Sequence, residues 1–274
     1  MHTTSIHRPR PHASRALTLA CAVAAASALC GTTAFAQSAG DDGPSVTPYR
    51  PSVSTPAALS APGYLELEAG VIRSSGGGSP RVDGVPYTLK LAFTPDWGVR
   101  IGGDARVGQD DGNGGRIHGF GDTSIVLKRR FAVDDASAFG LEGGVSMPTG
   151  KRGISSGKAD YGITGIYSAD LGDYHTDLNL GATRIGAPDA GTSRTQALWA
   201  ASLSKALNEQ WGVVGEFSGT HQRGAQGTAQ FLAAASYNVS KTLSLDAGVA
   251  RSLRNGSPDW SVFTGLTVLG PRLF

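Results

Sequence analysis

His118, His175 and His221 are the first candidates for chemistry in the main part of this chain. Their separations in sequence match no known pattern of metal ligands. Ser218 lies close to His221, but no neighbouring acid is positioned in the sequence to orient the ring, as nucleophilic catalysis requires. We therefore expect no metal site, no catalytic residues and no enzymatic activity.

Two glycine-rich stretches resemble phosphate-binding loops at first sight. In "MPTGKRG" Lys151 is followed by Arg152, where a P-loop carries Ser or Thr, and Val145 occupies the position of the first P-loop glycine. The stretch "SSGKAD" (155–160) lacks the same features. Both stretches therefore predict flexible surface loops, and the sequence predicts no cofactor.

Ionisable residues elsewhere in the chain alternate with apolar ones. In "GIYSADLGDYHTDLNLGA" (165–182) apolar side chains occupy every second position on both sides of Gly172 and Asp173. Successive side chains of a strand point to opposite faces, so this pattern predicts a hairpin with one apolar and one polar face. Tyr167, Leu171, Tyr174, Leu178 and Leu180 share the apolar face, and Ser168, Asp170, His175, Asp177 and Asn179 share the polar one.

The same two-residue period recurs along most of the chain. These segments are longer than the usual soluble strand of about 5–6 residues, and a tilted strand of that length crosses an apolar layer of about 25 Å. Short turns alternate with long polar links such as "SSGGGSPRVDG" and "GQDDGNGGRIHGFG". The strands predicted in this way cover 64–73, 85–94, 97–107, 121–131, 137–148, 160–171, 174–185, 195–207, 211–221, 228–239, 242–253 and 260–269.

Aromatic residues gather at the ends of these segments, with Trp97, Tyr174 and Trp211 directly after short turns. Strands can span hydrocarbon only as a closed barrel, because every backbone polar group must then pair within the protein. The sequence therefore predicts an all-β fold, a transmembrane antiparallel up-and-down β-barrel of about 12 strands in the outer membrane. Outer-membrane lipid is a predicted partner, and the C-terminal Phe274 is a predicted signal for the barrel-assembly machinery.

Alternation also predicts which charged residues face the lumen. Either they pair across the lumen and fill it, or they form a charged constriction along a solute path. A barrel of about 12 strands lies between filled barrels of about 8 and open porins of about 16–18, so both alternatives stay open. Val126, Ile166 and Phe263 share the inward register, which indicates a partly apolar lumen or a β-bulge. The residues chosen for the lumen and solute path are Glu68, Lys90, Arg100, Asp104, Arg106, Lys128, Arg130 and Glu142.

The N-terminal part of the chain divides into two segments. Residues 1–36 contain Arg8, Arg10 and Arg15, then an apolar run and "AFA" before Gln37, as in a cleaved secretory signal peptide. Residues 37–62 are rich in Pro and Ser and predict a periplasmic arm, and residues 63–274 form the barrel. Both cysteines lie within the first segment. Its removal leaves 21 basic against 22 acidic residues, so no case for nucleic-acid binding remains.

Three stretches resemble a known family: "RPSVSTPAALSAPGYLELEAG" (50–70), "GFGDTSIVLKRRF" (119–131) and "MPTGKRGISSGKADYGITGIYSADL" (147–171). They are similar to the MetA-pathway of phenol degradation family of outer-membrane transporters. The resemblance implies a small-molecule channel, linked by name to aromatic compounds, and brings no catalytic residues. It also implies that the Pro-rich stretch 50–62 belongs to the family pattern, and we expect this stretch to fold back into or under the barrel mouth.

The predicted function is an outer-membrane channel that passes a small solute, aromatic compounds among the candidates, by diffusion through a polar lumen. The alternative is a filled barrel with a structural or adhesive role and no transport. A barrel hydrolase is the least favoured of the three. The sequence names neither the solute nor its direction of travel.

Overall fold

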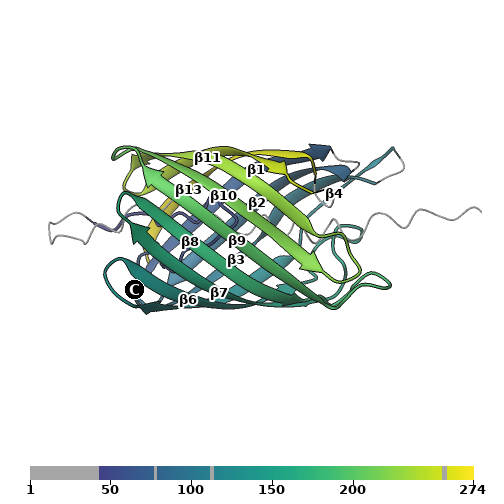
Figure 1. Ribbon diagram of the computed structural model, residues 1–274, viewed down its shortest axis with the longest axis horizontal. Coiled ribbons are helices and arrows are strands. Elements are labelled where there is room, and N and C mark those ends of the chain that lie inside the picture. The colour runs from purple at the N-terminus through teal and green to yellow at the C-terminus, as the bar shows by residue number, and fades with distance from the viewer. Residues whose placement is uncertain (1–42, 77–78, 112–113, 255–257) are drawn as a thin grey trace, which may run out of the picture.

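The computed structural model describes residues 43–76, 79–111, 114–254 and 258–274; the segment predicted as a signal peptide lies outside them. Its architecture is one sheet of 13 strands rolled into a barrel (Figure 1). The strands are β1 (Tyr64–Gly76), β2 (Ser79–Ala92), β3 (Trp97–Asp110), β4 (Arg116–Gly119), β5 (Thr123–Ala132), β6 (Ser137–Met147), β7 (Asp160–Leu171), β8 (Tyr174–Arg184), β9 (Thr195–Ala206), β10 (Trp211–Gln222), β11 (Thr228–Ser240), β12 (Leu243–Ser252) and β13 (Trp260–Arg272).

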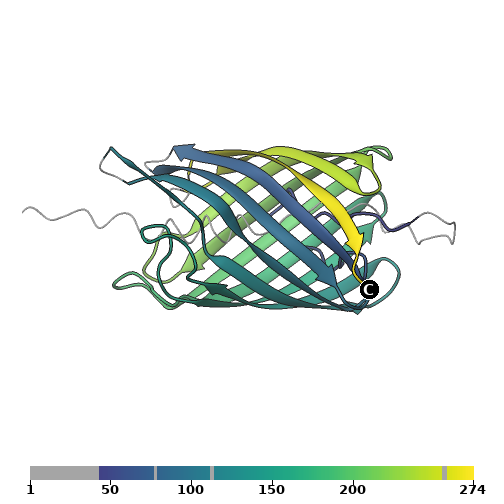
Figure 2. The same cartoon turned by 180° about the vertical axis from the view of Figure 1, so that it is seen from behind.

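The barrel closes because β1 pairs with both β2 and β13, and β2 in turn pairs with β3. All strand pairs are antiparallel, and sequence neighbours are spatial neighbours except at β4. The short β4 pairs only with the end of β3, so the barrel proper consists of the twelve long strands (Figure 2). This closure confirms the predicted up-and-down β-barrel. In the described part of the chain, no helix is long and apolar enough to cross a membrane.

The structure corrects two of the predicted connections. β1 and β2 extend toward each other until only residues 77–78 separate them, so most of the predicted link 74–84 is strand. The predicted loop 108–121 contains β4, which continues the wall beside residues 107–110 of β3. In both places the backbone of the polar stretch is paired in the sheet, which the side-chain pattern does not indicate.

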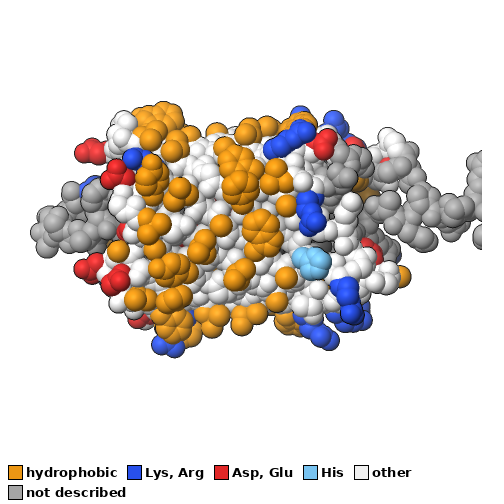
Figure 3. Space-filling view, viewed as in Figure 1, with side chains coloured by type: hydrophobic (Ala, Val, Ile, Leu, Met, Phe, Trp, Pro, Cys, Tyr) orange, Lys and Arg blue, Asp and Glu red, His pale blue; other side chains and the backbone are white. Residues whose placement is uncertain are grey.

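Apolar side chains cover the outside of the barrel, with charged residues mainly toward its two ends (Figure 3). Leu180 is 72% exposed, and Phe217 and Phe231 form a cross-strand ring pair with centroids 4.9 Å apart. Near one end the guanidinium of Arg129 lies 5.1 Å from the Trp97 ring centroid and 4.6 Å from that of Phe131. A cation over interfacial aromatic rings is favourable where water and lipid meet.

The two ends of the barrel differ. The short-turn end carries the connections at residues 93–96, 133–136, 172–173, 207–210 and 241–242, and the C-terminus (Figure 1). The long-loop end carries the connections 148–159, 185–194 and 223–227. Residues 43–62, here called the arm, precede β1 and enter the barrel from the short-turn end, where they appear as the purple segment.

Candidate functional site: the lumen and its arm

The arm is bound to the barrel through its own backbone. Carboxylates of Glu66 and Glu68 on β1 accept hydrogen bonds from the backbone N–H groups of Thr47 (2.9 Å) and Tyr49 (2.5 Å). On the opposite side Glu216 accepts from the N–H groups of Val53 and Ser54, both at 2.8 Å. An irregular segment leaves its backbone groups unpaired, and these buried carboxylates take the place of a neighbouring strand.

Two further contacts fix the middle of the arm. Asn179 on β8 accepts from the Thr55 N–H (2.7 Å) and donates to the Thr55 carbonyl (2.9 Å), so one side-chain amide pairs with both backbone groups of one residue. Ser168 accepts from the Ala57 N–H at 2.7 Å. Ala57 also packs against Ala138 and Ile166 in a small buried apolar cluster. The alternating polar face of the hairpin 165–182 thus faces the arm.

A bidentate ion pair holds the arm on the other wall. Arg50 Nε and Nη2 lie 3.0 and 3.1 Å from the two carboxylate oxygens of Asp246 on β12. The guanidinium rests in a hollow formed by Gly70 and Gly265, which pair across β1 and β13. A Cβ at Gly265 would lie 2.4 Å from Arg50 Nε, so both the missing side chains and the acid shape this site.

Further charged residues pair among themselves on the wall. Lys90 Nζ lies 2.5 Å from Glu66 and 2.6 Å from Glu68, and Arg100 Nη2 lies 2.7 Å from Glu142. Lys128 Nζ lies 3.4 Å from Glu142 and also donates to the Pro56 carbonyl of the arm. These side chains are largely buried, and burial of charge is tolerated where opposite charges and hydrogen bonds surround it.

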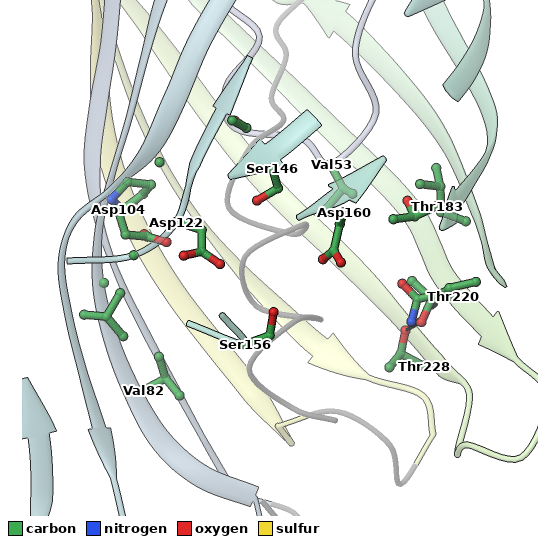
Figure 4. Close-up of a pocket in the computed structure, with 18 of the residues that line it drawn as sticks. Val53, Val82, Asp104, Asp122, Ser146, Ser156, Asp160, Thr183, Thr220 and Thr228 are labelled. Carbon is green, nitrogen blue, oxygen red and sulfur yellow. Dashed lines mark hydrogen bonds between the residues drawn. The ribbon is translucent and has the colours of Figure 1, made fainter. Parts of the chain in front are cut away.

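A cavity of about 920 Å³ lies between the arm and the long-loop end. Arg50, Pro51, Val53 and Thr55 of the arm form part of its lining. In the close-up Asp104 and Asp122 stand on one side, and Thr183, Thr220 and Thr228 on the other (Figure 4). The lumen is therefore filled at the short-turn end and hollow beyond it. Both sequence alternatives, a filled and an open lumen, are realised in different halves of one barrel.

The cavity wall is acidic on one side. Asp104, Asp122 and Asp160 line it, and in the described ranges no Lys or Arg forms an ion pair with any of them. Asp122 and Asp160 each accept one backbone N–H, from Gly150 at 2.9 Å and Gly186 at 2.7 Å. The lysines and arginines at the floor are paired with carboxylates. The exposed Arg152 also lines the cavity, but the three aspartates outnumber it, so the field in the cavity favours cations over anions.

The structure brings most of the chosen lumen residues together. Those that meet around the arm are Glu68, Lys90, Arg100, Lys128 and Glu142. Asp104 lines the cavity, and Arg130 shares the face of Lys128 and lies half-buried near the short-turn end.

The placement of Arg106 in the lumen is wrong. A register shift between Val85 and Pro86 leaves Ala105 unpaired on β3, so the strand reverses its faces at this bulge. Val107 is consequently buried and lines the cavity, whereas Arg106 is exposed on the outer face.

For Val126, Ile166 and Phe263, the sequence predicted either a β-bulge or a partly apolar lumen, and the structure shows the second. No register shift occurs along β5–β6, β6–β7 or β12–β13. Val126 and Phe263 line the cavity, and Phe263 packs against a buried apolar cluster that contains Val214 and Leu232.

The residues chosen from the sequence for the lumen and solute path did not include Arg50, Asn179 and Asp160, although Asn179 was placed on the polar face of its hairpin. Asp160 shares the inward register of Ser168 and Asp170, but nothing in the irregular arm singles out Arg50.

The candidate catalytic groups do not meet. Ser218 is buried and faces the cavity, whereas His221 is exposed on the outer face of the same strand. His175 contacts Asp170 at 2.6 Å and Asp177 at 3.3 Å near the short-turn end. Among the described residues, no group of three or more His, Cys, Asp and Glu side chains is arranged to hold a metal ion.

Comparison with known protein families places this lumen in context. Residues 91–269 match the family described as MetA-pathway of phenol degradation. The chain belongs to this family. The match spans the barrel from the end of β2 to β13, and so confirms the resemblance inferred from the sequence. Among curated proteins, no sequence matches the chain.

Two solved structures resemble this family member in fold. The COG4313 outer membrane channel from Pseudomonas putida F1 is 13% identical over 78% of this chain and 97% of its own, with a TM-score of 0.59. The KdgM porin, in a complex with disordered oligogalacturonate, is 10% identical over 74% of this chain and 98% of its own, with a TM-score of 0.53. At such identities the likeness establishes the shared barrel fold.

Proposed function

We propose that this protein is an outer-membrane channel for a small solute, and that the arm closes it at the short-turn end. The observation that carries the proposal is the division of the lumen. A cavity of about 920 Å³ has polar and ionisable groups on its wall and the arm at its floor. The names of the structural neighbours, a channel and a porin, support the same function. Solutes then pass when the arm moves aside.

The chemistry of the floor favours a movable closure over a permanent one. The barrel strands are joined by continuous ladders, whereas the arm is held mainly by side chains such as Glu216, Asn179 and Ser168. A net side-chain hydrogen bond contributes about 0.5–1.5 kcal/mol, and one to a charged group such as Glu216 about 1.5–3 kcal/mol, because water replaces it when it breaks. The arm is therefore the part of the lumen with the lowest cost of displacement.

A reversible cross-link tests this mechanism. A Cβ at Gly140 would lie 3.3 Å from the Cα of Ala57, so cysteines at these two positions are close enough for a disulfide between arm and wall. In planar bilayers we expect the oxidised Ala57→Cys/Gly140→Cys protein to show fewer opening events than the same protein after reduction. The single variants Ala57→Cys and Gly140→Cys, treated in the same way, are the controls.

Three outcomes separate the candidate functions. Discrete conductance that rises on reduction of the double variant supports a channel with a movable arm. Equal conductance in both redox states contradicts closure by the arm. Silence of the reduced protein and of a variant lacking residues 44–60 contradicts transport and favours the structural or adhesive barrel. An ester-hydrolysis assay on the same samples tests the hydrolase alternative, for which we expect no turnover.

The remaining partners are proposals of the same kind. The apolar outer face fits outer-membrane lipid, and the many exposed apolar side chains on it support location in that membrane. Phe274 is 61% exposed at the end of the chain, where Leu273 N–H donates to the Gly63 carbonyl at 2.7 Å. An exposed terminal aromatic supports the proposed recognition by the barrel-assembly machinery.

A further inference from the structure

Tyr49 of the arm occupies an unusual place in the lumen. Its side chain is 3% exposed, and three cations surround the ring. Lys90 Nζ lies 3.9 Å and Lys128 Nζ 4.3 Å from the ring centroid, and the Arg100 guanidinium lies 5.9 Å away. The phenol hydroxyl accepts from Lys128 Nζ at 3.1 Å and donates to the Ala58 carbonyl at 2.7 Å.

The three cations, here called the cation cage, belong to the barrel and not to the arm. They project from β2, β3 and β5, and carboxylates of the barrel hold each one in place. Lys90 is paired with Glu66 and Glu68, and both Arg100 and Lys128 with Glu142. The cage therefore does not depend on the arm for its charge balance, although Lys90 also donates to the Thr47 carbonyl and Lys128 to the Pro56 carbonyl.

The chemistry of the cage matches one class of ligand. Cations over a ring face recognise its π-electrons, which an aliphatic ring lacks. Lys128 adds a donor for a hydroxyl at the ring edge. A ring without a hydroxyl would leave that donor short of one partner, and an alcohol without a ring would leave the cations without a π-face. The side chain that satisfies both is a phenol.

We propose that the cation cage is a binding site for phenolic compounds, and that Tyr49 occupies it as a tethered phenol while the arm is in place. Beside Tyr49 the cage leaves a void of only about 10 Å³, so a free phenol and Tyr49 exclude each other. A phenolic solute therefore competes with the arm for one site. This inference rests on the proposed channel function, and it makes the solute itself the agent that releases the closure.

The test of competition uses a cysteine as a reporter of arm release. Ser52 is 0% exposed, and both natural cysteines, Cys21 and Cys30, belong to the segment predicted as a signal peptide. In protein embedded in lipid nanodiscs, a maleimide should label Ser52→Cys slowly, and phenol should accelerate the labelling. Competition raises the displaced fraction by 1 + [L]/Kd, about threefold when phenol is at twice its Kd. Cyclohexanol, which has the hydroxyl but no π-face, should leave the rate unchanged and controls for effects on the membrane.

Direct binding to Tyr49→Ala gives a second measurement, because this change vacates the cage without altering the barrel wall. Equilibrium dialysis against radiolabelled phenol should show one site per barrel above the background of empty nanodiscs. Tyr49→Phe keeps the ring and should bind less phenol than Tyr49→Ala does. If Tyr49→Ala does not fold, the labelling rate of the Ser52→Cys protein decides alone.

Each result has a defined meaning. Acceleration by cyclohexanol equal to that by phenol, or no phenol bound by Tyr49→Ala, overturns the proposed site. Binding by Tyr49→Ala without accelerated labelling keeps the site and overturns the competition. A barrel that conducts on release of the cross-linked arm but ignores phenol overturns this inference alone. Phenol binding in a barrel that never conducts retains the cage and overturns the channel.

Discussion

The most informative residues are Asp104 and Arg106 on β3, because the two-residue period of the sequence places both side chains on the same, inward face of the strand. The structure separates them by the bulge at Ala105, with Asp104 on the cavity wall and Arg106 on the outer face. A β-bulge adds one residue to one strand, so every side chain beyond it changes faces. One unpaired residue thus decides which of the two charged side chains faces the lumen.

Because the two side chains lie on different faces, we expect different outcomes when each is replaced by an uncharged residue. Asp104→Asn removes a carboxylate that has no cationic partner among the described residues, so we expect a lower cation-to-anion permeability ratio. A unit charge about 10 Å from an ion in water contributes about 0.4 kcal/mol, which corresponds to about twofold. Arg106→Gln, the matched control, should leave the ratio unchanged. Reversal potentials in asymmetric salt at neutral pH measure both.

A change in the ratio for Arg106→Gln with none for Asp104→Asn would contradict the bulge. It would return Arg106 to the lumen, as alternation without a bulge predicts.

At the scale of elements, the twelve long strands were predictable because each crosses an apolar layer. One face must then be apolar over its whole length, so apolar residues occur at every second position of the sequence. The bulge left a weaker signal, Pro86 on β2, since proline cannot donate to a ladder and is confined to edges and bulges. β4 left none, because a strand of four residues is too short to show a period.

The position of the arm could be predicted only as a general fold-back into or under the barrel mouth. Its contacts run from backbone N–H groups to carboxylates, and a backbone N–H is the same in every residue except proline. Glu68 was predicted to face the lumen, either paired with another charge or along a solute path, and Glu66 and Glu216 share its inward register. Glu66 and Glu68 contact both Lys90 and backbone N–H groups of the arm. The two-residue period therefore predicted where the carboxylate acceptors lie, but not which donors bind to them.

The wall next to β4 depends on a close approach that only glycine allows. β3 pairs with β5 only as far as Gly102, and beyond it the segment 119–122 completes the wall through a hydrogen bond from Gly121 N–H to the Asp104 carbonyl. A Cβ at Gly103 would lie 2.7 Å from the Asp122 carbonyl oxygen, whereas a Cβ at Gly143 meets nothing within 4 Å.

We therefore expect Gly103→Ala to lower the free energy of unfolding by about 1–3 kcal/mol, the usual cost of forcing a group into a packed site. Gly143→Ala on β6 adds the same methyl group to open space and should leave stability unchanged. Urea unfolding in lipid vesicles, followed by tryptophan fluorescence, compares the two. Equal stability of both variants would show that Asp122 does not pack closely against Gly103 of β3.

At the scale of the whole molecule, a single layer of strands forms the barrel wall, and each strand has one face toward the lumen and one toward the outside. The side chains of Asn179 and Leu180 are neighbours in sequence, yet one binds the arm in the lumen and the other is 72% exposed outside. The arm, the cation cage and the cavity all depend on this wall, because carboxylates such as Glu216 are buried only while the barrel stays closed.

The depth of the barrel in the membrane follows from the same wall and can be measured. Leu180 lies near the middle of β8 on the outer face, and Leu171 is the last residue of β7 beside the turn at the short-turn end. An arginine costs about 2–4 kcal/mol at the middle of a bilayer and about 0–1 kcal/mol near its surface. Leu180→Arg should therefore reduce the unfolding free energy in lipid vesicles by several times as much as Leu171→Arg. In detergent micelles, which adapt to the protein surface, the difference should shrink. Equal losses at both positions would mean that the apolar belt does not coincide with the middle of β8, and that the barrel sits in the bilayer at another height.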